Sequence, residues 1–392
     1  MRSAIVAFLS ITLLSLSTGP TRVAARDEQP FAAIYTAMMA DGLEGIFTNP
    51  RLLRTGQEFA GVAWEERHGP WSQVGVSVYR PGSFDVFTMP RVPEVRGLGG
   101  AMTARGCPMV AYGTPDRVVL GTLAHGVFES AVVSPRGGTV FDLATAGADR
   151  SWVLFAQEGD DGGTLCVAAG RRSRWDPVTI DLPAGLPQGV RRFGPARLAM
   201  APDGRPAAVF LVTAGGRSIL CRARPGAGGW VTDSLAPVLG GCAPEGRLGL
   251  AFDGAGHLQV ALSTLPDMRL LYASVDDPSS QPVEPDPGCA LRVPQVDLAF
   301  DNDGTAHCIY FARTPDGGMQ VRLARRVNGR WTTRMVDRTM NKLPTASLTL
   351  ALQRGMSPYL SYTIGPSRRV IMAYPKGEGP PGLEAGGTLL PR

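Results

Sequence analysis

Lysine, histidine and catalytic signatures are scarce in this sequence. It has two lysines, Lys342 and Lys376, and four histidines among 392 residues. It contains no Gly-x-Ser-x-Gly nucleophile elbow, no phosphate-binding loop, and no Cys-x-x-Cys or cysteine–histidine spacing suited to zinc. The sequence therefore assigns no catalytic residue, no metal site and no cofactor, and it leaves the binding residues unknown.

A dividing linker and concentrated charge are also lacking. No central Gly/Pro-rich stretch splits the chain, and the 49 glycines and 33 prolines are spread along it as expected for many turns. The net charge of +5 is carried almost entirely by arginine, in short scattered pairs such as Arg191-Arg192. Scattered pairs are typical of solvated strand ends, so we expect one domain and no nucleic-acid partner.

What is present is a repeated pattern of short strands, clearest in Pro294–Arg338. Val296, Leu298 and Phe300 alternate with Asp297 and Ala299, which is typical of a half-buried strand. Turn residues of the Asp, Asn and Gly type separate it from the strands that follow. The four predicted strands of this unit are Val296–Phe300, Ala306–Ala312, Met319–Arg325 and Trp331–Val336.

Versions of this unit recur along the chain. The glycines of the first turn, Gly204, Gly256, Gly304 and Gly355, return about every 50 residues, a period typical of propeller blades. A four-stranded meander cannot bury both of its faces alone, so neighbouring copies must cover it. We predict an all-β propeller over residues 26–376 with about seven four-stranded blades, six or eight being the alternatives.

The two ends of the chain complete this prediction. The last repeat stops at Tyr374 after three strands, and residues 377–392 are too rich in Gly and Pro to supply a fourth. Closure of the ring would then use an N-terminal strand, near Phe31–Thr36 or Gly45–Thr48. Such closure would also remove exposed sheet edges.

Residues 1–25 have the pattern of a secretory signal peptide. Arg2 is followed by the apolar run Ala4–Leu16 and by the small residues Val23-Ala24-Ala25, where cleavage is expected near Ala25. The run is short for a bilayer span, and a retained anchor is the alternative. We predict a secreted or periplasmic protein with no transmembrane segment after cleavage.

Six cysteines remain in the predicted exported chain. An even number in an oxidising compartment favours disulfides, although six cysteines allow 15 connectivities. We expect Cys221–Cys242 and Cys289–Cys308, and less firmly Cys107–Cys166 between adjacent blades. The alternative is that they are free thiols buried as small apolar side chains.

The unit resembles the repeats of sialidase-like (BNR, or Asp-box) propellers over roughly residues 57–374. In that family the Asp-box lies between the third and fourth strands of a blade. The matching places here keep a turn, a glycine or a tryptophan but lack the serine and the aspartate. They read Val327-Asn328-Gly329-Arg330-Trp331, Pro225-Gly226-Ala227-Gly228-Gly229-Trp230 and Arg172-Ser173-Arg174-Trp175.

The resemblance implies an arginine triad, a Tyr–Glu nucleophile pair and an acid/base aspartate. Arg91 in Arg91-Val92-Pro93 faintly matches the first arginine, but a loop is the better interpretation. Most tyrosines lie inside apolar strands and fit core packing. Glu65 and Glu66 are expected to be solvated, and the equivalent His257 and His307 are expected to flank turns.

We therefore predict a non-catalytic, secreted propeller. It would bind a glycan, a peptide or a cell-surface protein through its loop face, and it would act as a monomer. The alternative is a sialidase-like glycoside hydrolase or lyase with a non-standard active site. Convergent arginines and a Tyr–Glu contact at the centre of the ring would favour this enzyme.

Overall fold

The computed structural model describes residues 31–375 with short gaps. These gaps are at 39–45, 56–57, 81–82, 148–149, 160–162, 172–173, 187–191, 215, 236–242, 277–283, 340–345, 354–356 and 365–368. Every regular element in the described part is a β-strand. The predicted signal peptide and the C-terminal tail lie outside these residues. Within the described part, no helix has the length and apolar character needed to cross a membrane.

Four of the sheets are four-stranded antiparallel meanders. The first contains β2 (Ile46–Thr55), β3 (Glu58–His68), β4 (Trp71–Arg80) and β5 (Ser83–Thr88). The second contains β6 (Arg96–Met102), β7 (Pro108–Gly113), β8 (Val118–Ala124) and β9 (Val127–Ser134). The third contains β10 (Thr139–Ala146), β11 (Arg150–Gln157), β12 (Thr164–Arg171) and β13 (Arg174–Thr179). The fourth contains β14 (Arg192–Met200), β15 (Pro206–Ala214), β16 (Arg217–Gly226) and β17 (Gly229–Ser234).

A seven-stranded sheet follows along the chain. Its two parts are antiparallel, and they are joined by one parallel residue pair, Arg247 with Gln295. The first part contains β18 (Ala243–Phe252), β19 (Leu258–Leu265) and β20 (Arg269–Ser274). The second contains β21 (Leu291–Phe300), β22 (Ala306–Arg313), β23 (Met319–Val327) and β24 (Arg330–Thr339).

The last sheet joins the two ends of the described chain. It contains β25 (Ala346–Gln353), β26 (Ser357–Ile364), β27 (Arg369–Pro375) and, as its outer strand, β1 (Phe31–Met38). β1 pairs antiparallel with β27, from Phe31 opposite Pro375 to Met38 opposite Arg369. Of the two predicted closing segments, the one near Phe31–Thr36 therefore supplies the closing strand.

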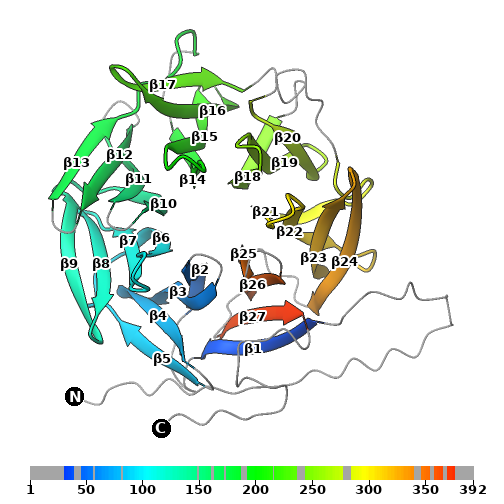
Figure 1. Ribbon diagram of the computed structural model, residues 1–392, viewed down its shortest axis with the longest axis horizontal. Helices are drawn as coiled ribbons and strands as arrows, with labels where there is room; N and C mark the ends of the chain where they lie inside the picture. Colours follow the sequence, from blue (N-terminus) through cyan, green and yellow to red (C-terminus); the bar gives the residue numbers. More distant parts are fainter. Residues whose placement is uncertain are drawn as a thin grey trace.

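These sheets radiate from a common centre (Figure 1). The first strand of each unit lies nearest the centre, and the outer strands form the periphery. The protein is an all-β propeller, as the repeat period predicted. Its sheets are not uniformly four-stranded in the described part, because β18–β20 form a three-stranded group that is bonded to β21.

The units share one register between their first two strands. In each unit one residue of the innermost strand pairs with the residue ten positions later in the chain, which lies on the second strand. These pairs are Leu52–Val62, Gly100–Val110, Leu143–Val153, Leu198–Ala208, Leu250–Val260, Leu298–Cys308 and Leu350–Leu360. In every unit, the residue two positions after the paired residue of the second strand has a large, buried side chain. These residues are Trp64, Tyr112, Phe155, Phe210, Leu262, Tyr310 and Tyr362.

The hydrophobic core lies between the sheets. The cluster between the fourth and fifth units joins Val209 to Leu250, and the cluster between the last and first units joins Tyr359 to Trp64. Each unit thus shields from water an apolar sheet face that its neighbour could not bury alone. Closure by β1 extends this burial around the whole ring.

Candidate functional site

Charged side chains gather where the innermost strands surround the centre. The residue before the shared register position forms a belt, which we call the channel belt. In chain order it consists of Arg51, Gly99, Asp142, Arg197, Gly249, Asp297 and Thr349. The order Arg-Gly-Asp thus occurs twice in succession and is followed by a threonine.

The two aspartates of the belt link neighbouring units. Asp142 Oδ2 accepts hydrogen bonds from Arg197 Nε at 3.0 Å and from the Leu198 backbone N–H at 2.9 Å. Asp297 Oδ2 accepts equivalent bonds from Thr349 Oγ1 at 3.1 Å and from the Leu350 N–H at 2.9 Å. Each aspartate therefore fastens its own unit to the next one along the chain.

Arg197 connects three units at once. While its Nε donates to Asp142, its Nη1 forms an ion pair with Asp297 Oδ1 at 3.1 Å. This pair joins β14 to β21, although the innermost strand β18 lies between them. Glycine makes this reach possible, because a Cβ on Gly249 would come within 2.7 Å of Asp297 and Leu298 backbone atoms. Burial alone would lower the pKa of Arg197, but Asp297 and Asp142 outweigh it and raise the pKa on balance.

Arg51 crosses its neighbouring unit in the same way. Its Nε donates to the Leu98 carbonyl at 2.8 Å, and its Nη2 donates to the Phe141 carbonyl two units away at 3.0 Å. Gly100 lies beside Arg51, and a Cβ atom added to this glycine would lie only 2.8 Å from the Cβ of Arg51. A cavity of about 440 Å³ opens above the belt, with Arg51, Asp142 and Arg197 among its lining residues.

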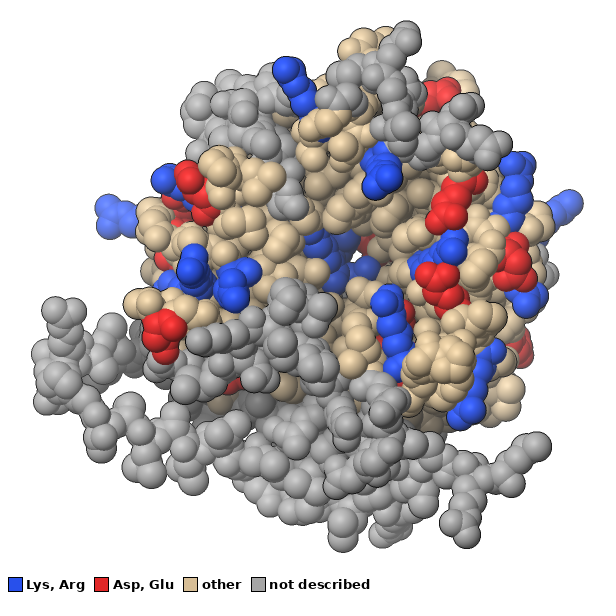
Figure 2. Space-filling view, turned by 180° about the vertical axis from the view of Figure 1, so that it is seen from behind, with Lys and Arg blue, Asp and Glu red and all other residues tan. Residues whose placement is uncertain are grey.

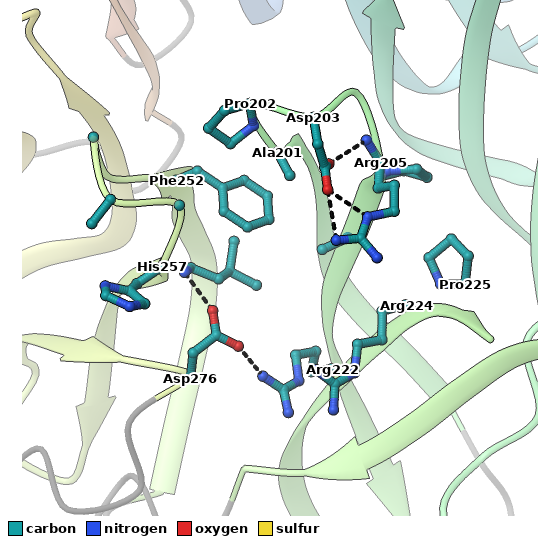
Figure 3. A pocket seen from close by; sticks show the side chains of 16 residues that line it. Ala201, Pro202, Asp203, Arg205, Arg222, Arg224, Pro225, Phe252, His257 and Asp276 are labelled. Atoms are coloured by element: carbon teal, nitrogen blue, oxygen red, sulfur yellow. Dashed lines mark hydrogen bonds and ion pairs between the residues drawn. The ribbon is translucent and has the colours of Figure 1, made fainter.

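A larger pocket lies between β14–β17 and β18–β20 (Figure 3). Its volume is about 560 Å³, within the range of small-molecule sites. We call it the inter-blade pocket. Its apolar surface comes from Phe252, Leu258, Pro202, Pro206 and Ala207. The turns after β14 and β18, together with the end of β16, supply its polar rim.

The rim carries three arginines, and their carboxylate partners are Asp203, Asp233 and Asp276. Arg222 is fixed, because its Nε and Nη2 donate to Asp233 at 3.1 and 2.7 Å and its Nη1 pairs with Asp276. Arg205 binds Asp203 at 2.6 Å, yet 79% of its side chain is exposed. Arg224 is 54% exposed and lies 3.8 Å from Asp233. The rim therefore presents two exposed guanidinium groups beside a largely buried one (Figure 3).

The tyrosines and the first-arginine match behave as the sequence predicted. Tyr112, Tyr272, Tyr310, Tyr362 and Tyr374 are all at most 5% exposed. Arg91 stacks over the Trp71 ring, with its Cζ 4.0 Å from the ring centroid, and stands in the connection after β5. Neither observation places these residues at the channel belt.

Glu65 and Glu66 are not solvated, contrary to the prediction. Both lie within β3. Glu65 is fully buried and accepts hydrogen bonds from Thr48 Oγ1 at 3.1 Å and Asn49 Nδ2 at 2.7 Å. Glu66 bonds His68 Nε2 at 2.5 Å and Gln73 Nε2 at 2.8 Å. Local polar partners explain how a strand end can bury two carboxylates.

His257 and His307 flank equivalent turns, as expected, but in different surroundings. His307 is buried, and its Nε2 lies 3.0 Å from Asp301 Oδ2. His257 is exposed at the inter-blade pocket, with its Nδ1 3.6 Å from Asp253. Asp301 also accepts hydrogen bonds from the Asp303 and Thr305 N–H groups, so the segment from Asp301 to Gly304 is a turn. The described residues contain no group of three His, Cys, Asp or Glu side chains suited to a metal.

The described cysteines are free thiols: Cys107, Cys166, Cys221, Cys289 and Cys308. A Cys289–Cys308 bond does not fit this strand geometry. Cys289 directly precedes Ala290, which bonds Arg313, and Arg313 lies five residues along β22 from Cys308. That separation is about 16 Å, whereas a disulfide needs Cα atoms within about 7 Å. Cys107 and Cys166 are both free, so the predicted bond between them is not formed either. Cys221 is free as well, and its predicted partner Cys242 lies outside the described residues.

Neither the channel belt nor the pocket rim is predicted from the sequence. Asp297 alternates with apolar residues and was expected on the open face of a half-buried strand, but it is 1% exposed. The innermost strand is covered on both sides, so a charge in it needs partners from other units. Alignment of the repeats on the shared register would have revealed the doubled Arg-Gly-Asp order.

The chain matches no known protein-family model, and no curated protein matches it by sequence. Among solved structures, puromycin hydrolase is similar at 15% identity and a TM-score of 0.51, covering 84% of this chain and 52% of that one. AofleA from Arthrobotrys oligospora has 10% identity and a TM-score of 0.48, covering 88% and 95%. An α-L-arabinanase from Penicillium chrysogenum has 12% identity and a TM-score of 0.48, covering 84% and 92%. At these identities the similarity concerns the fold alone.

Proposed function

We propose that this protein is a non-catalytic propeller that binds an acidic glycan in the inter-blade pocket. The observation that carries the proposal is the composition of that pocket. An apolar floor that includes Phe252 and prolines lies beside an arginine-rich rim, within about 560 Å³. Few, well-placed polar groups over an apolar surface are the usual design of ligand sites.

The two exposed guanidinium groups of the rim favour an anionic ligand. Arg222 is held in place by Asp233 and Asp276, so it costs little further ordering when a ligand arrives. Arg205 and Arg224 are largely exposed and can turn toward a carboxylate or sulfate group. The Phe252 ring and the proline faces suit the C–H surface of a sugar ring.

The experiment is a glycan array followed by calorimetry on the leading hits. We expect uronic-acid or sulfated glycans to bind and their neutral counterparts to bind more weakly. Arg205→Ala combined with Arg224→Ala should reduce affinity about tenfold or more. Arg217→Ala is the matched control, because Arg217 is also exposed on the fourth sheet but begins β16, seven residues from Arg224. Equal affinity for neutral and acidic glycans, or binding of acidic peptides alone, would contradict the proposal.

A sialidase-like glycoside hydrolase or lyase remains the alternative function. The channel belt and its neighbourhood supply two buried arginines, Arg51 and Arg247, and the largely buried Arg197, which is the feature that would favour it. However, Arg197 already holds two of the chain's own carboxylates, and Tyr310 and Tyr362 bond aspartates rather than glutamates. Turnover of a fluorogenic sialoside would overturn the preference for a binding protein.

We also propose that the ring has seven blades, with β18–β20 and β21–β24 counted as two blades joined by one residue pair. The shared register in seven units supports this count. Export is proposed from the pattern of residues 1–25, and the binding partner would then be a soluble or cell-surface glycan.

A further inference from the structure

Arg247 is a buried arginine, and two of its donor atoms have no hydrogen-bond partner in the described part of the chain. It lies in β18, two residues before Gly249, and it pairs with Gln295, which stands two residues before Asp297 of the channel belt. Its exposed fraction is 8%, and neither its Nε nor its Nη2 has a hydrogen-bond partner among the described residues. Burial lowers the pKa of Arg247 from its ordinary value, with Asp297 acting in the opposite direction.

Asp297, the carboxylate that acts on Arg247, already accepts hydrogen bonds at both of its oxygens. Asp297 Oδ2 is taken by Thr349 and Leu350, while Oδ1 accepts the Leu298 N–H at 3.1 Å and pairs with Arg197. Arg51 adds a further buried donor without a partner, its Nη1. Arg51, Arg247 and the largely buried Arg197 thus face two aspartates, which leaves one positive charge without a counter-charge near the axis. An uncompensated buried charge is costly, so this arrangement favours an added anion.

The two free donors of Arg247 define the shape of that anion. Nε–H and one Nη2–H project from the same edge of the guanidinium plane, at the spacing of two oxygens of a carboxylate or phosphate. Figure 2 shows arginine side chains around the central opening, on the face turned away in Figure 1. Both lysines lie outside the described residues, so the blue side chains there are arginines.

We propose that the channel is a second binding site, separate from the inter-blade pocket, in which Arg247 holds a small oxyanion through Nε and Nη2. The ligand class is a carboxylate or phosphate-type anion, recognised by two acceptor oxygens. Gln295 is the neighbouring residue in register, and its Oε1 is also buried without a partner. It therefore offers a built-in test, because a carboxylate at position 295 would take the place of the external anion.

The test measures thermal unfolding of the full mature chain with rising phosphate, sulfate or acetate, against chloride at matched ionic strength. We expect saturable stabilisation by at least one oxyanion and a clearly smaller effect of chloride. The phosphate and acetate arms identify which oxyanion type the site prefers. In Arg247→Gln the oxyanion affinity should fall about tenfold or more, since a bidentate charged pair is lost. Gln295→Glu should also abolish the oxyanion response, while raising stability in its absence.

The control is Arg205→Ala combined with Arg224→Ala, which should keep the response if the anion binds in the channel. Because Arg247→Gln removes an uncompensated charge, it should fold. A crystal of the wild-type protein soaked in selenate gives an independent check through an anomalous peak beside Arg247. Equal responses to chloride and to oxyanions, an unchanged response in Arg247→Gln, or a crystal in which Gln295 Oε1 accepts from Arg247 with no anion would overturn the proposal.

Discussion

The channel belt and the inter-blade pocket both use arginine and aspartate, but their surroundings differ. In the belt, the Arg197 side chain is 15% exposed and holds two carboxylates from different units. At the pocket rim, Arg205 is 79% exposed and holds one carboxylate two residues away in its own turn. Buried pairs are strongly coupled and expensive to break, whereas exposed pairs contribute little to stability. The belt therefore fixes the ring, and the rim remains available for a ligand.

The largest effect should come from removing a belt carboxylate. Asp297→Asn leaves Arg197 and Arg247 with less compensating charge in a buried setting, so we expect a loss of about 3–5 kcal/mol in the free energy of unfolding. Asp203→Asn breaks an exposed pair and should cause no measurable change. Chemical denaturation of both variants makes the comparison. Equal midpoints for the two variants would show that burial does not distinguish these clusters.

Glycines give a second comparison of the same two regions. A Cβ on Gly249 would lie 2.5 Å from the Leu298 nitrogen and 2.7 Å from the Asp297 carbonyl carbon, both backbone atoms. Gly249→Ala should therefore cost about 1–3 kcal/mol through overpacking. Gly254, in the pocket turn, has no atom within 4 Å of such a Cβ. We expect Gly254→Ala to be neutral in thermal denaturation, and a neutral Gly249→Ala would contradict the close approach.

The two equivalent histidines extend the comparison to pH. Burial lowers the pKa of His307 below its ordinary value of 6.5, and the charges of Arg325 and Arg334 lower it further. The hydrogen bond with Asp301 acts in the opposite direction but does not outweigh them. The unfolded chain then binds more protons than the folded one, so stability is complete above pH 6.5 and falls as the pH drops through this value. Denaturation between pH 7.5 and 5 should show this loss, and His307→Gln should reduce it.

The exposed His257 is the control for the pH experiment. His257→Gln is the matched substitution, because it replaces the equivalent histidine at an exposed position. Asp301 acts in a lower pH range: burial would raise the pKa of its carboxyl, but hydrogen bonds from His307 and Thr305 lower it on balance. A wild-type stability that stays flat from pH 7.5 to 5 would contradict the assignment to His307.

Cysteine labelling should give the smallest effect. Burial raises the pKa of Cys221 to about 12 and that of Cys308 well above 9.0, so few thiolates form at pH 8. We expect neither thiol to react with iodoacetamide in the native protein, and Cys308 to react in urea, as mass spectrometry can follow. Rapid native labelling of either residue would contradict its burial.

The repeat period and the turn residues were enough to predict the propeller and its closing strand. Alternation in Val296–Phe300 and turn chemistry such as Asn328-Gly329 act over a few residues, and both central residues of that turn have positive φ in the structure. The three-strand final repeat ending at Tyr374 likewise required a strand from elsewhere. Local physics therefore determined the units and their need for neighbours.

Only the tertiary structure decided what the charged residues do. Asp297 was expected to face outward from a half-buried strand, but its contacts come from Arg197, about a hundred residues earlier in the chain, and from Thr349, in the next sheet. The rim of the inter-blade pocket likewise joins the turns after β14 and β18. The sequence by itself specified the strands, because they depend on neighbouring residues. The channel belt and the pocket depend on closure of the ring, which brings distant strands together and buries or exposes their charges.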